Sequence, residues 1–174
     1  MMSLKTLLEK SHQALQDRGV DHALIGGFAL AVLGIPRATN DVDYLVDESQ
    51  KENARTALLE AGWKVNFETE DVIHFSDQGS VDLLVARRPL SKKMLKNATV
   101  VGSFGIKCLL PEAIIGLKIQ AYINDSTREF QDKADIQALI IRYGAALNWD
   151  ELFGYADLFG EKPFLLSLRK KLCP

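Results

Sequence analysis

The sequence is short of the residues that build disulfide-bonded or zinc-bound small proteins. Its 174 residues include two cysteines, Cys108 and Cys173, which lie far apart and form no CxxC motif. The three histidines, at positions 12, 22 and 74, show no zinc spacing either. A chain of this length buries roughly 70% of its unfolded surface, so it needs no disulfide or structural metal to form a core. If the protein binds a metal, carboxylates are the expected ligands.

An excess of one charge and a long apolar run are also missing. The net charge is −2, which gives no general attraction to nucleic acid. No apolar run reaches the eighteen or so residues needed to cross a bilayer, and residues 1–19 carry charges throughout, unlike a signal peptide. With 47% hydrophobic and 25% charged residues, the composition is that of an ordinary globular protein. We therefore expect a cytoplasmic protein with no membrane partner.

Hydrophobic periodicity predicts a mixed α/β part followed by a helical part. Apolar or alternating runs predict strands at 22–25, 41–46, 63–68, 72–76 and 80–86, with one or two short β segments in 98–110. Helical spacing predicts helices at 4–18, 28–33, 48–60, 111–121, 130–142, 149–159 and 162–172. We expect 90–97 to be a flexible loop. The chain therefore divides into an α/β core, 1–110, and a helical C-terminal part, 111–174, which we expect to pack together as one unit.

Three aspartates stand inside apolar, strand-like runs. Asp41 and Asp43 lie in Asp-Val-Asp-Tyr-Leu-Val, and Asp82 lies in Ser-Val-Asp-Leu-Leu-Val. A carboxylate in such a run is costly to bury unless something pairs with it, and a hard divalent cation is the simplest partner. Asp41 and Asp43 are two residues apart on a strand, so they project from the same face. If the strand of Asp82 lies beside them, the three carboxylates can hold magnesium, and Asp82 can accept the proton of an attacking hydroxyl.

A glycine pair, Gly26-Gly27, separates a short apolar strand from an apolar helix. Glycines at such a place let the backbone approach a phosphate closely. Each motif is weak alone, because a double glycine is commonly a turn and Asp-x-Asp also occurs in surface turns and in glycosyltransferases. Their order and spacing together indicate phosphoryl or nucleotidyl transfer.

The same residues carry a family resemblance. Ile25-Gly26-Gly27, thirteen residues, Asp41-Val42-Asp43 and a later Asp82 resemble the signature of the nucleotidyltransferase superfamily of DNA polymerase β-type folds. The longer phrase from Gly26 to Asp43, with Arg37 and Thr39 inside it, resembles the minimal, AbiEii-like branch known from toxin–antitoxin and abortive-infection systems. Two later segments match that branch loosely: Pro111-Glu112 with Lys118, and Asp132-Lys133-Ala134-Asp135.

The resemblance implies a fold, a reaction and a set of residues. The fold is an α/β nucleotidyltransferase fold, with a small mixed, twisted sheet flanked by helices and a helical C-terminal part. The reaction moves a nucleoside monophosphate from an NTP to an acceptor hydroxyl, with magnesium or manganese as the cofactor. The implied catalytic and metal-binding residues are Asp41, Asp43 and Asp82, and the implied nucleotide-binding residues are Gly26, Gly27, Arg37, Thr39 and Lys118. Many relatives carry serine at the position of Gly27, so phosphate binding here must rely on the backbone.

Several alternatives stay open at this point. The acceptor is an RNA 3′ end such as that of tRNA, a protein hydroxyl or a small molecule, and a cognate antitoxin is a further expected partner. An RNA acceptor would need a basic groove, whose candidates are Arg87, Arg88, Lys92, Lys93 and Lys96. Arg37 could instead be a surface loop residue and Lys118 an ordinary amphipathic-helix lysine. Asp132, Lys133 and Asp135 suit a solvated helix face or a set of ion pairs. The alternative for the whole protein is a non-catalytic module of the same fold that binds a nucleotide or a partner.

Overall fold

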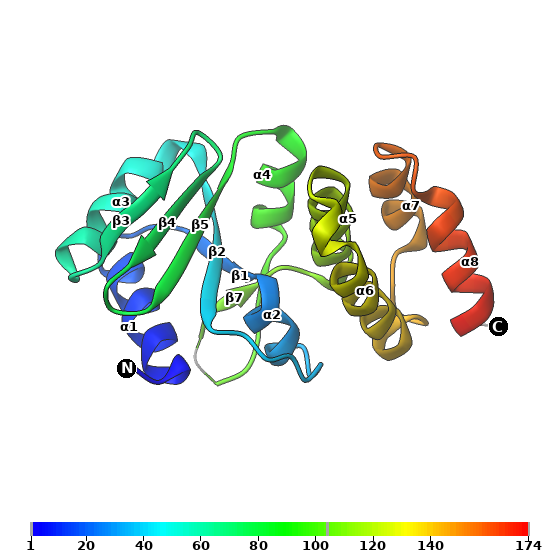
Figure 1. The fold of residues 1–174 in the computed structure, drawn as a ribbon, viewed down its shortest axis with the longest axis horizontal. Helices are drawn as coiled ribbons and strands as arrows, with labels where there is room; N and C mark the ends of the chain where they lie inside the picture. Colours follow the sequence, from blue (N-terminus) through cyan, green and yellow to red (C-terminus); the bar gives the residue numbers. More distant parts are fainter. Residues whose placement is uncertain (1, 104, 174) are drawn as a thin grey trace. The chain divides into compact units, whose positions relative to one another are not determined.

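The computed structural model of the chain describes residues 2–103 and 105–173 (Figure 1). Contacts within the chain divide it into two compact units, Met1–Leu109 and Leu110–Pro174. The helices of the first unit are α1 (Leu4–Asp17), α2 (Gly26–Val32), the 3₁₀ helix η1 (Glu48–Gln50), α3 (Lys51–Glu60) and α4 (Pro89–Lys96). Its strands are β1 (His22–Ile25), β2 (Asp41–Asp47), β3 (Lys64–Glu68), β4 (Val72–Ser76), β5 (Ser80–Ala86), β6 (Thr99–Val100) and β7 (Lys107–Cys108).

The seven strands form one mixed sheet in the order β3-β4-β5-β2-β1-β7-β6. Strand β2 is central and runs parallel to β5 on one side and antiparallel to β1 on the other. Strands β3, β4 and β5 form an antiparallel meander at one edge. The mixed sheet flanked by helices confirms the predicted fold class.

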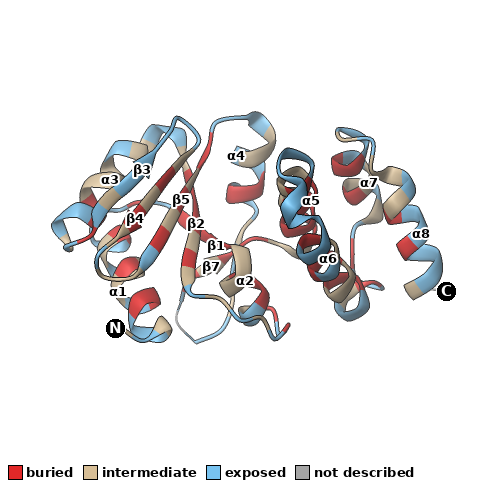
Figure 2. Cartoon of the chain, viewed as in Figure 1, coloured by how far each residue is buried: buried red, intermediate tan, exposed pale blue. Residues whose placement is uncertain are grey.

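The two faces of the sheet differ in how they are covered. On β2, β4 and β5, every second side chain is buried, and Figure 2 shows the alternation along β4 and β5. Helices α1 and α3 pack together and against β2. The Tyr44 hydroxyl, on the buried face of β2, lies 2.9 Å from that of Ser11 on α1. The opposite face carries Asp41, Asp43 and Asp82, all of intermediate burial.

The prediction of a flexible loop at 90–97 is wrong, because this segment is the helix α4. Pro89 occupies its first turn, where a missing backbone N–H costs nothing. The Ser91 hydroxyl accepts a hydrogen bond from the Arg88 backbone N–H at 3.2 Å. Met94 and Leu95 are buried, and α4 packs against β2 and β5. The burial of Met94 and Leu95, which stand among lysines, therefore attaches the helix to the sheet.

In the second unit, the described residues 110–173 form helices and no strand, as the periodicity predicts. They are α5 (Pro111–Asn124), the 3₁₀ helix η2 (Ser126–Arg128), α6 (Glu129–Tyr143), α7 (Trp149–Asp157) and α8 (Lys162–Leu172). Helix α5 packs against α6 and α7, and α8 packs against α6 and α7. In the part of the chain that the structure describes, no helix combines the length and the apolar character needed to cross a membrane.

Candidate active site

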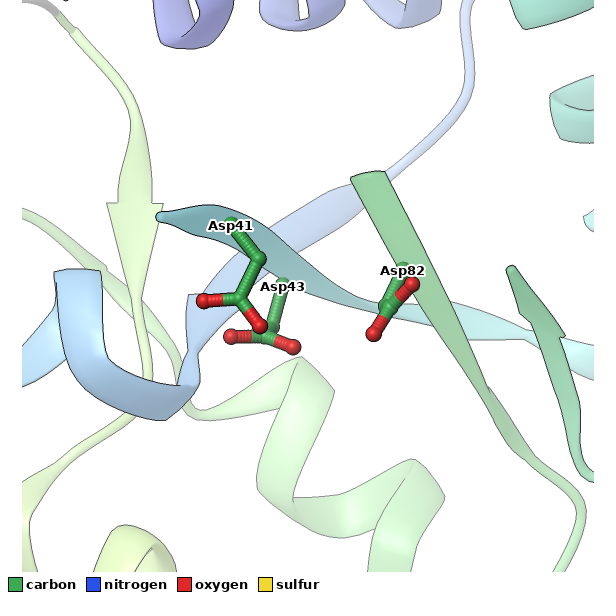
Figure 3. Close-up of side chains that lie close together, drawn as sticks. All are labelled: Asp41, Asp43 and Asp82. Atoms are coloured by element: carbon green, nitrogen blue, oxygen red, sulfur yellow. The ribbon is translucent and has the colours of Figure 1, made fainter. Parts of the chain in front are cut away.

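Asp41, Asp43 and Asp82 converge on one face of the sheet, opposite the face that carries Tyr44 (Figure 3). One carboxylate oxygen of each lies within 4.8 Å of those of the other two. The register explains this, because β2 and β5 are parallel neighbours with Asp43 directly opposite Asp82 and Asp41 opposite Ser80. The condition attached to the sequence prediction, that the strand of Asp82 lies beside that of Asp41 and Asp43, is therefore met.

The environment of Asp82 favours its protonated form. Partial burial of the carboxyl raises its pKa above the ordinary value, and the negative charge of Asp41 adds to the shift. The His74 imidazole opposes both effects. A raised pKa makes this carboxylate a stronger base than an ordinary aspartate. A cation bound beside Asp82 and Asp41 would offset the repulsion between their charges.

His74 is the site residue that the sequence analysis missed. Its Nδ1 lies 2.7 Å from Oδ1 of Asp82, and the two residues are direct partners across the antiparallel strands β4 and β5. This Oδ1 is buried, and no donor among the described residues makes a hydrogen bond of good geometry to it. The imidazole of His74 lies close to it but is not well aligned for a hydrogen bond. The sequence did contain the information needed to find it. His74 and Asp82 are each four residues from Gln78, the centre of the turn 77–79, so a hairpin at this turn places them opposite each other.

Each glycine of the pair is fixed by a different contact. Gly26 has φ +68°, a conformation that favours glycine, and a Cβ at this position would overlap the Asp43 carboxylate. Gly27 faces Thr39, and a Cβ there would come within 2.9 Å of the Thr39 Cβ and 3.0 Å of its Oγ1. The helix α2 begins at Gly26, two residues earlier than predicted, so both backbone N–H groups belong to its first turn.

Thr39 stands in the space that a side chain at Gly27 would enter. Its Oγ1 donates a hydrogen bond to the Asp41 carboxylate and also lies 3.3 Å from the Asp41 backbone oxygen. A hydroxyl is therefore present between the glycine pair and the first aspartate, although Gly27 supplies none. Arg37, earlier in the same loop, donates from Nη1 to the backbone oxygen of Ala38 at 2.9 Å.

Comparison with known proteins identifies the fold through solved structures. No protein-family model and no curated protein matches the sequence. The structure of ANT(2″)-Ia in complex with adenylyl-2″-tobramycin is similar with a TM-score of 0.71 at 16% identity, covering 88% of this chain and 97% of that one. An antigenic nucleotidyltransferase-like protein from Paracoccidioides brasiliensis has a TM-score of 0.60 at 24% identity, with coverage of 96% and 92%. The lincosamide antibiotic adenylyltransferase LnuA, bound to lincomycin, has a TM-score of 0.54 at 16% identity, with coverage of 79% and 96%.

The chain has the nucleotidyltransferase fold. On this fold, the donor set of the three aspartates fits a hard divalent cation, because every donor is a carboxylate oxygen and the group carries more negative charge than His74 can balance. The buried, poorly hydrogen-bonded Oδ1 of Asp82 points the same way.

Lys118 lies in the second unit, inside a buried ion-pair set. Its Nζ is 3.0 Å from Oδ1 of Asp132 and 2.7 Å from Oδ2 of Asp135. Lys118, Asp132 and Asp135 are only 8%, 2% and 4% exposed. Of the two interpretations considered for Asp132 and Asp135, the ion-pair set is confirmed and the solvated helix face is wrong. Lys133 instead pairs with Glu129 one turn earlier on α6, at 2.6 Å.

The basic residues after β5 are engaged with acidic ones. Arg87 forms ion pairs with Glu48, Glu70 and Asp71 at 3.3, 2.7 and 3.4 Å. Lys92 also pairs with Glu48, at 3.4 Å. Two of the five candidates for an RNA-binding groove are therefore already partly neutralised by neighbouring carboxylates.

Proposed function

We propose that the chain is a metal-dependent nucleotidyltransferase that moves a nucleoside monophosphate from an NTP to an acceptor hydroxyl. The convergence of Asp41, Asp43 and Asp82 on one face of the sheet carries this proposal. The nucleotidyltransferase fold of the chain, similar to those of ANT(2″)-Ia and LnuA, supports it. Because these likenesses are at 16% identity, they support the fold, and the site residues support the chemistry.

The cofactor proposed is Mg²⁺, or Mn²⁺ in its place, held by Asp41 and Asp43 with Asp82 as the third ligand or the general base. When bound, it neutralises phosphate charge and polarises the attacked phosphorus. The backbone N–H groups of Gly26 and Gly27 are the proposed donors to the triphosphate. We assign to the Thr39 hydroxyl the part that serine at the second glycine position plays in relatives. Arg37 is proposed as a further phosphate or acceptor contact from the same loop.

The reaction balances without any other co-reactant. The acceptor oxygen forms a bond to the α-phosphorus while the bond from that phosphorus to the β-phosphate bridging oxygen breaks, and pyrophosphate leaves. The hydroxyl proton passes to the Asp82 carboxylate, whose raised pKa favours uptake. Lys118 receives no step in this scheme, because its ammonium is bound to two buried carboxylates. Its proposed contact with nucleotide would require exchanging those partners for phosphate.

A small-molecule hydroxyl is the acceptor that the observations favour. The neighbouring folds include one solved with adenylyl-2″-tobramycin and one solved with lincomycin. In this chain, Arg87 and Lys92 are engaged with carboxylates, which weakens the case for an RNA groove beside β5. The AbiEii-like resemblance keeps a toxin role, with RNA or a protein as the acceptor and a cognate antitoxin, as a second proposal. A binding module without turnover is the alternative that experiment must separate from both.

The test is incubation of the purified protein with each α-labelled NTP, Mg²⁺ and a cell extract. We expect label to appear in a small molecule, and the labelled fraction identifies the acceptor class. Asp43→Ala should remove the label. Label in RNA or in a protein band would support the toxin proposal, and metal-dependent NTP binding with no label from any NTP would establish the binding module.

A further inference from the structure

A row of four residues crosses the sheet from the carboxylates to its free edge. Asp43 is paired with Asp82, Asp82 with His74, and His74 with Phe67, on the adjacent strands β2, β5, β4 and β3. Direct partners on neighbouring strands point to the same face, so all four side chains project from the face that carries the aspartates. The outer pair, His74 and Phe67, extends that face about 10 Å beyond Asp82, which is two strand spacings.

The outer end of the row is an aromatic platform that helices α1 and α3 do not cover. Phe67 is 54% exposed, and the His74 side chain is 40% exposed. Their ring centroids are 5.7 Å apart at an interplanar angle of 31°, so the two rings present one broad surface. A single exposed phenylalanine is ordinary. This one is joined through His74 to the proposed proton acceptor, because the imidazole also contacts Asp82.

The surroundings of the platform are uncharged or neutralised. The flanking side chains on the same face are Val72, Ser76, Ser80 and Leu84. At its borders, Lys64 pairs with Asp77 at 2.6 Å, and Arg87 pairs with Glu70 and Asp71. A polyanion would find the two cations at these borders, Lys64 and Arg87, already paired with carboxylates. A ligand ring with an apolar face can stack on these two aromatic side chains. A second ring or a substituent of the same ligand can then reach from the platform to Asp82.

We propose that Phe67 and His74 form the acceptor subsite of this protein and that it binds a hydroxyl-bearing ring compound of low molecular weight by stacking. The subsite rests on the proposed nucleotidyl transfer and names the class of its acceptor. The ring of the acceptor lies on Phe67 and His74, and its hydroxyl reaches toward Asp82. His74 also positions Asp82, because its Nδ1 lies beside Oδ1 of that carboxylate. The other carboxylate oxygen of Asp82 then remains available on the side of Asp41 and Asp43.

The test measures KM for the acceptor and for the NTP separately in wild type and in four variants. The acceptor probes are tobramycin, lincomycin and a short RNA ending in a ribose with free hydroxyls. Phe67→Ser should raise the acceptor KM about tenfold, because serine removes the ring on which the acceptor stacks. Phe67→Tyr keeps the ring and should stay within about twofold of wild type. His74→Asn should raise the acceptor KM and also lower kcat.

Two controls separate this subsite from a general structural effect. Val100→Ser, at an equally exposed apolar residue on β6 at the opposite sheet edge, should change none of the constants. The KM for the NTP and the affinity for Mn²⁺ should be unchanged in Phe67→Ser. In parallel, NMR of the wild-type protein with Mg²⁺ should show that bound tobramycin or lincomycin shifts the ring resonances of Phe67 and His74.

The possible results are distinguishable. Turnover with unchanged acceptor KM in both Phe67→Ser and His74→Asn would overturn the subsite while leaving the proposed function intact. Probe-induced shifts at Phe67 and His74 without any turnover would support the subsite and overturn the proposed function. Turnover with the RNA alone would overturn the assignment to a compound of low molecular weight. Neither turnover nor shifts with any of the three probes would overturn the subsite.

Discussion

At the residue scale, the glycine pair shows how two neighbouring glycines can be required for different reasons. Gly26 combines a positive φ of +68° with a close approach to the Asp43 carboxylate. Gly27 has an ordinary backbone conformation and is constrained by Thr39 instead. Gly26 is therefore required by the position of Asp43 on β2, and Gly27 by the position of Thr39 in the loop before β2.

Gly26→Ala should destabilise the protein more than backbone strain alone explains. Gly102 is the matched control, because its φ of +70° is nearly the same and nothing lies within 4 Å of a Cβ built there. Gly102→Ala should cost about 1 kcal/mol of unfolding free energy. Gly26→Ala should cost on the order of 3 kcal/mol and abolish transfer, because Asp43 must move. Urea denaturation measures both, and equal losses would show that the contact with Asp43 is unimportant.

Thr39→Val tests whether the threonine hydroxyl replaces the serine that the glycine pair lacks. Valine keeps the shape that packs on Gly27 but removes the donor to Asp41. A hydrogen bond to a charged group is worth roughly 1.5–3 kcal/mol, so the KM for the NTP should rise at least about tenfold. Thr39→Ser should retain most of the affinity. An unchanged KM in Thr39→Val would remove Thr39 from the nucleotide site.

At the scale of elements, most of the first unit could be predicted because each segment has a clear period. Helix α1 and strands β1, β2, β4 and β5 stand where alternation and helical spacing place them. Helix α4 was missed because four charged or polar residues hide its two buried ones, Met94 and Leu95. The early start of α2 was missed because two glycines at a helix start look like a turn.

The candidate site was predictable only in part, because hydrophobic periodicity locates the strands but does not show which strands are neighbours in the sheet. The alternation along β2 and β5 placed Asp41, Asp43 and Asp82 on strand faces, but their meeting depended on β2 and β5 becoming neighbours. His74 escaped notice because only the turn between β4 and β5 brings it opposite Asp82. The burial of Lys118 with Asp132 and Asp135 depends on the packing of α5 on α6, which no motif specifies.

The attachment of α1 to the sheet includes a pair of histidines in contact. His22 Nδ1 lies 2.7 Å from the Val20 carbonyl oxygen and must donate to it, so Nε2 of a neutral His22 accepts from His12 Nδ1 at 2.8 Å. Burial lowers the pKa of both imidazoles below the ordinary value of 6.5. A proton on Nε2 of His22 would turn this atom into a donor, so His12 would have to change tautomer to keep the hydrogen bond.

These lowered pKa values predict that stability falls as the solution is acidified. Well above pH 6.5 both histidines are neutral in the folded and unfolded chains, and their contribution to stability is constant. Below it, the unfolded chain binds protons that the folded chain refuses, so unfolding becomes easier, by up to about 1.4 kcal/mol per pH unit for each proton. Chemical denaturation between pH 7 and 5.5 measures the slope. A His12→Gln, His22→Gln double variant should flatten it, and an unchanged slope would assign it to other groups.

At the scale of the whole molecule, the charge bears on the kind of acceptor and the fold bears on the kind of reaction. The net charge of −2 gives no general attraction to a polyanion, and Arg87 and Lys92 after β5 are already paired with carboxylates. The fold brings three carboxylates together on one face of the sheet, and we propose that a nucleotide and a divalent cation meet there. The proposed function therefore depends on whether those carboxylates support transfer.

The most direct measurement compares label transfer from α-labelled NTPs by the wild type and by an Asp41→Asn, Asp43→Asn double variant. We expect magnesium-dependent transfer by the wild type and none by the double variant. We also expect the metal-free variant to unfold at the same temperature as the wild type or a higher one, because two mutually repelling charges have been removed. Full transfer by a folded double variant would show that Asp41 and Asp43 are not the catalytic carboxylates.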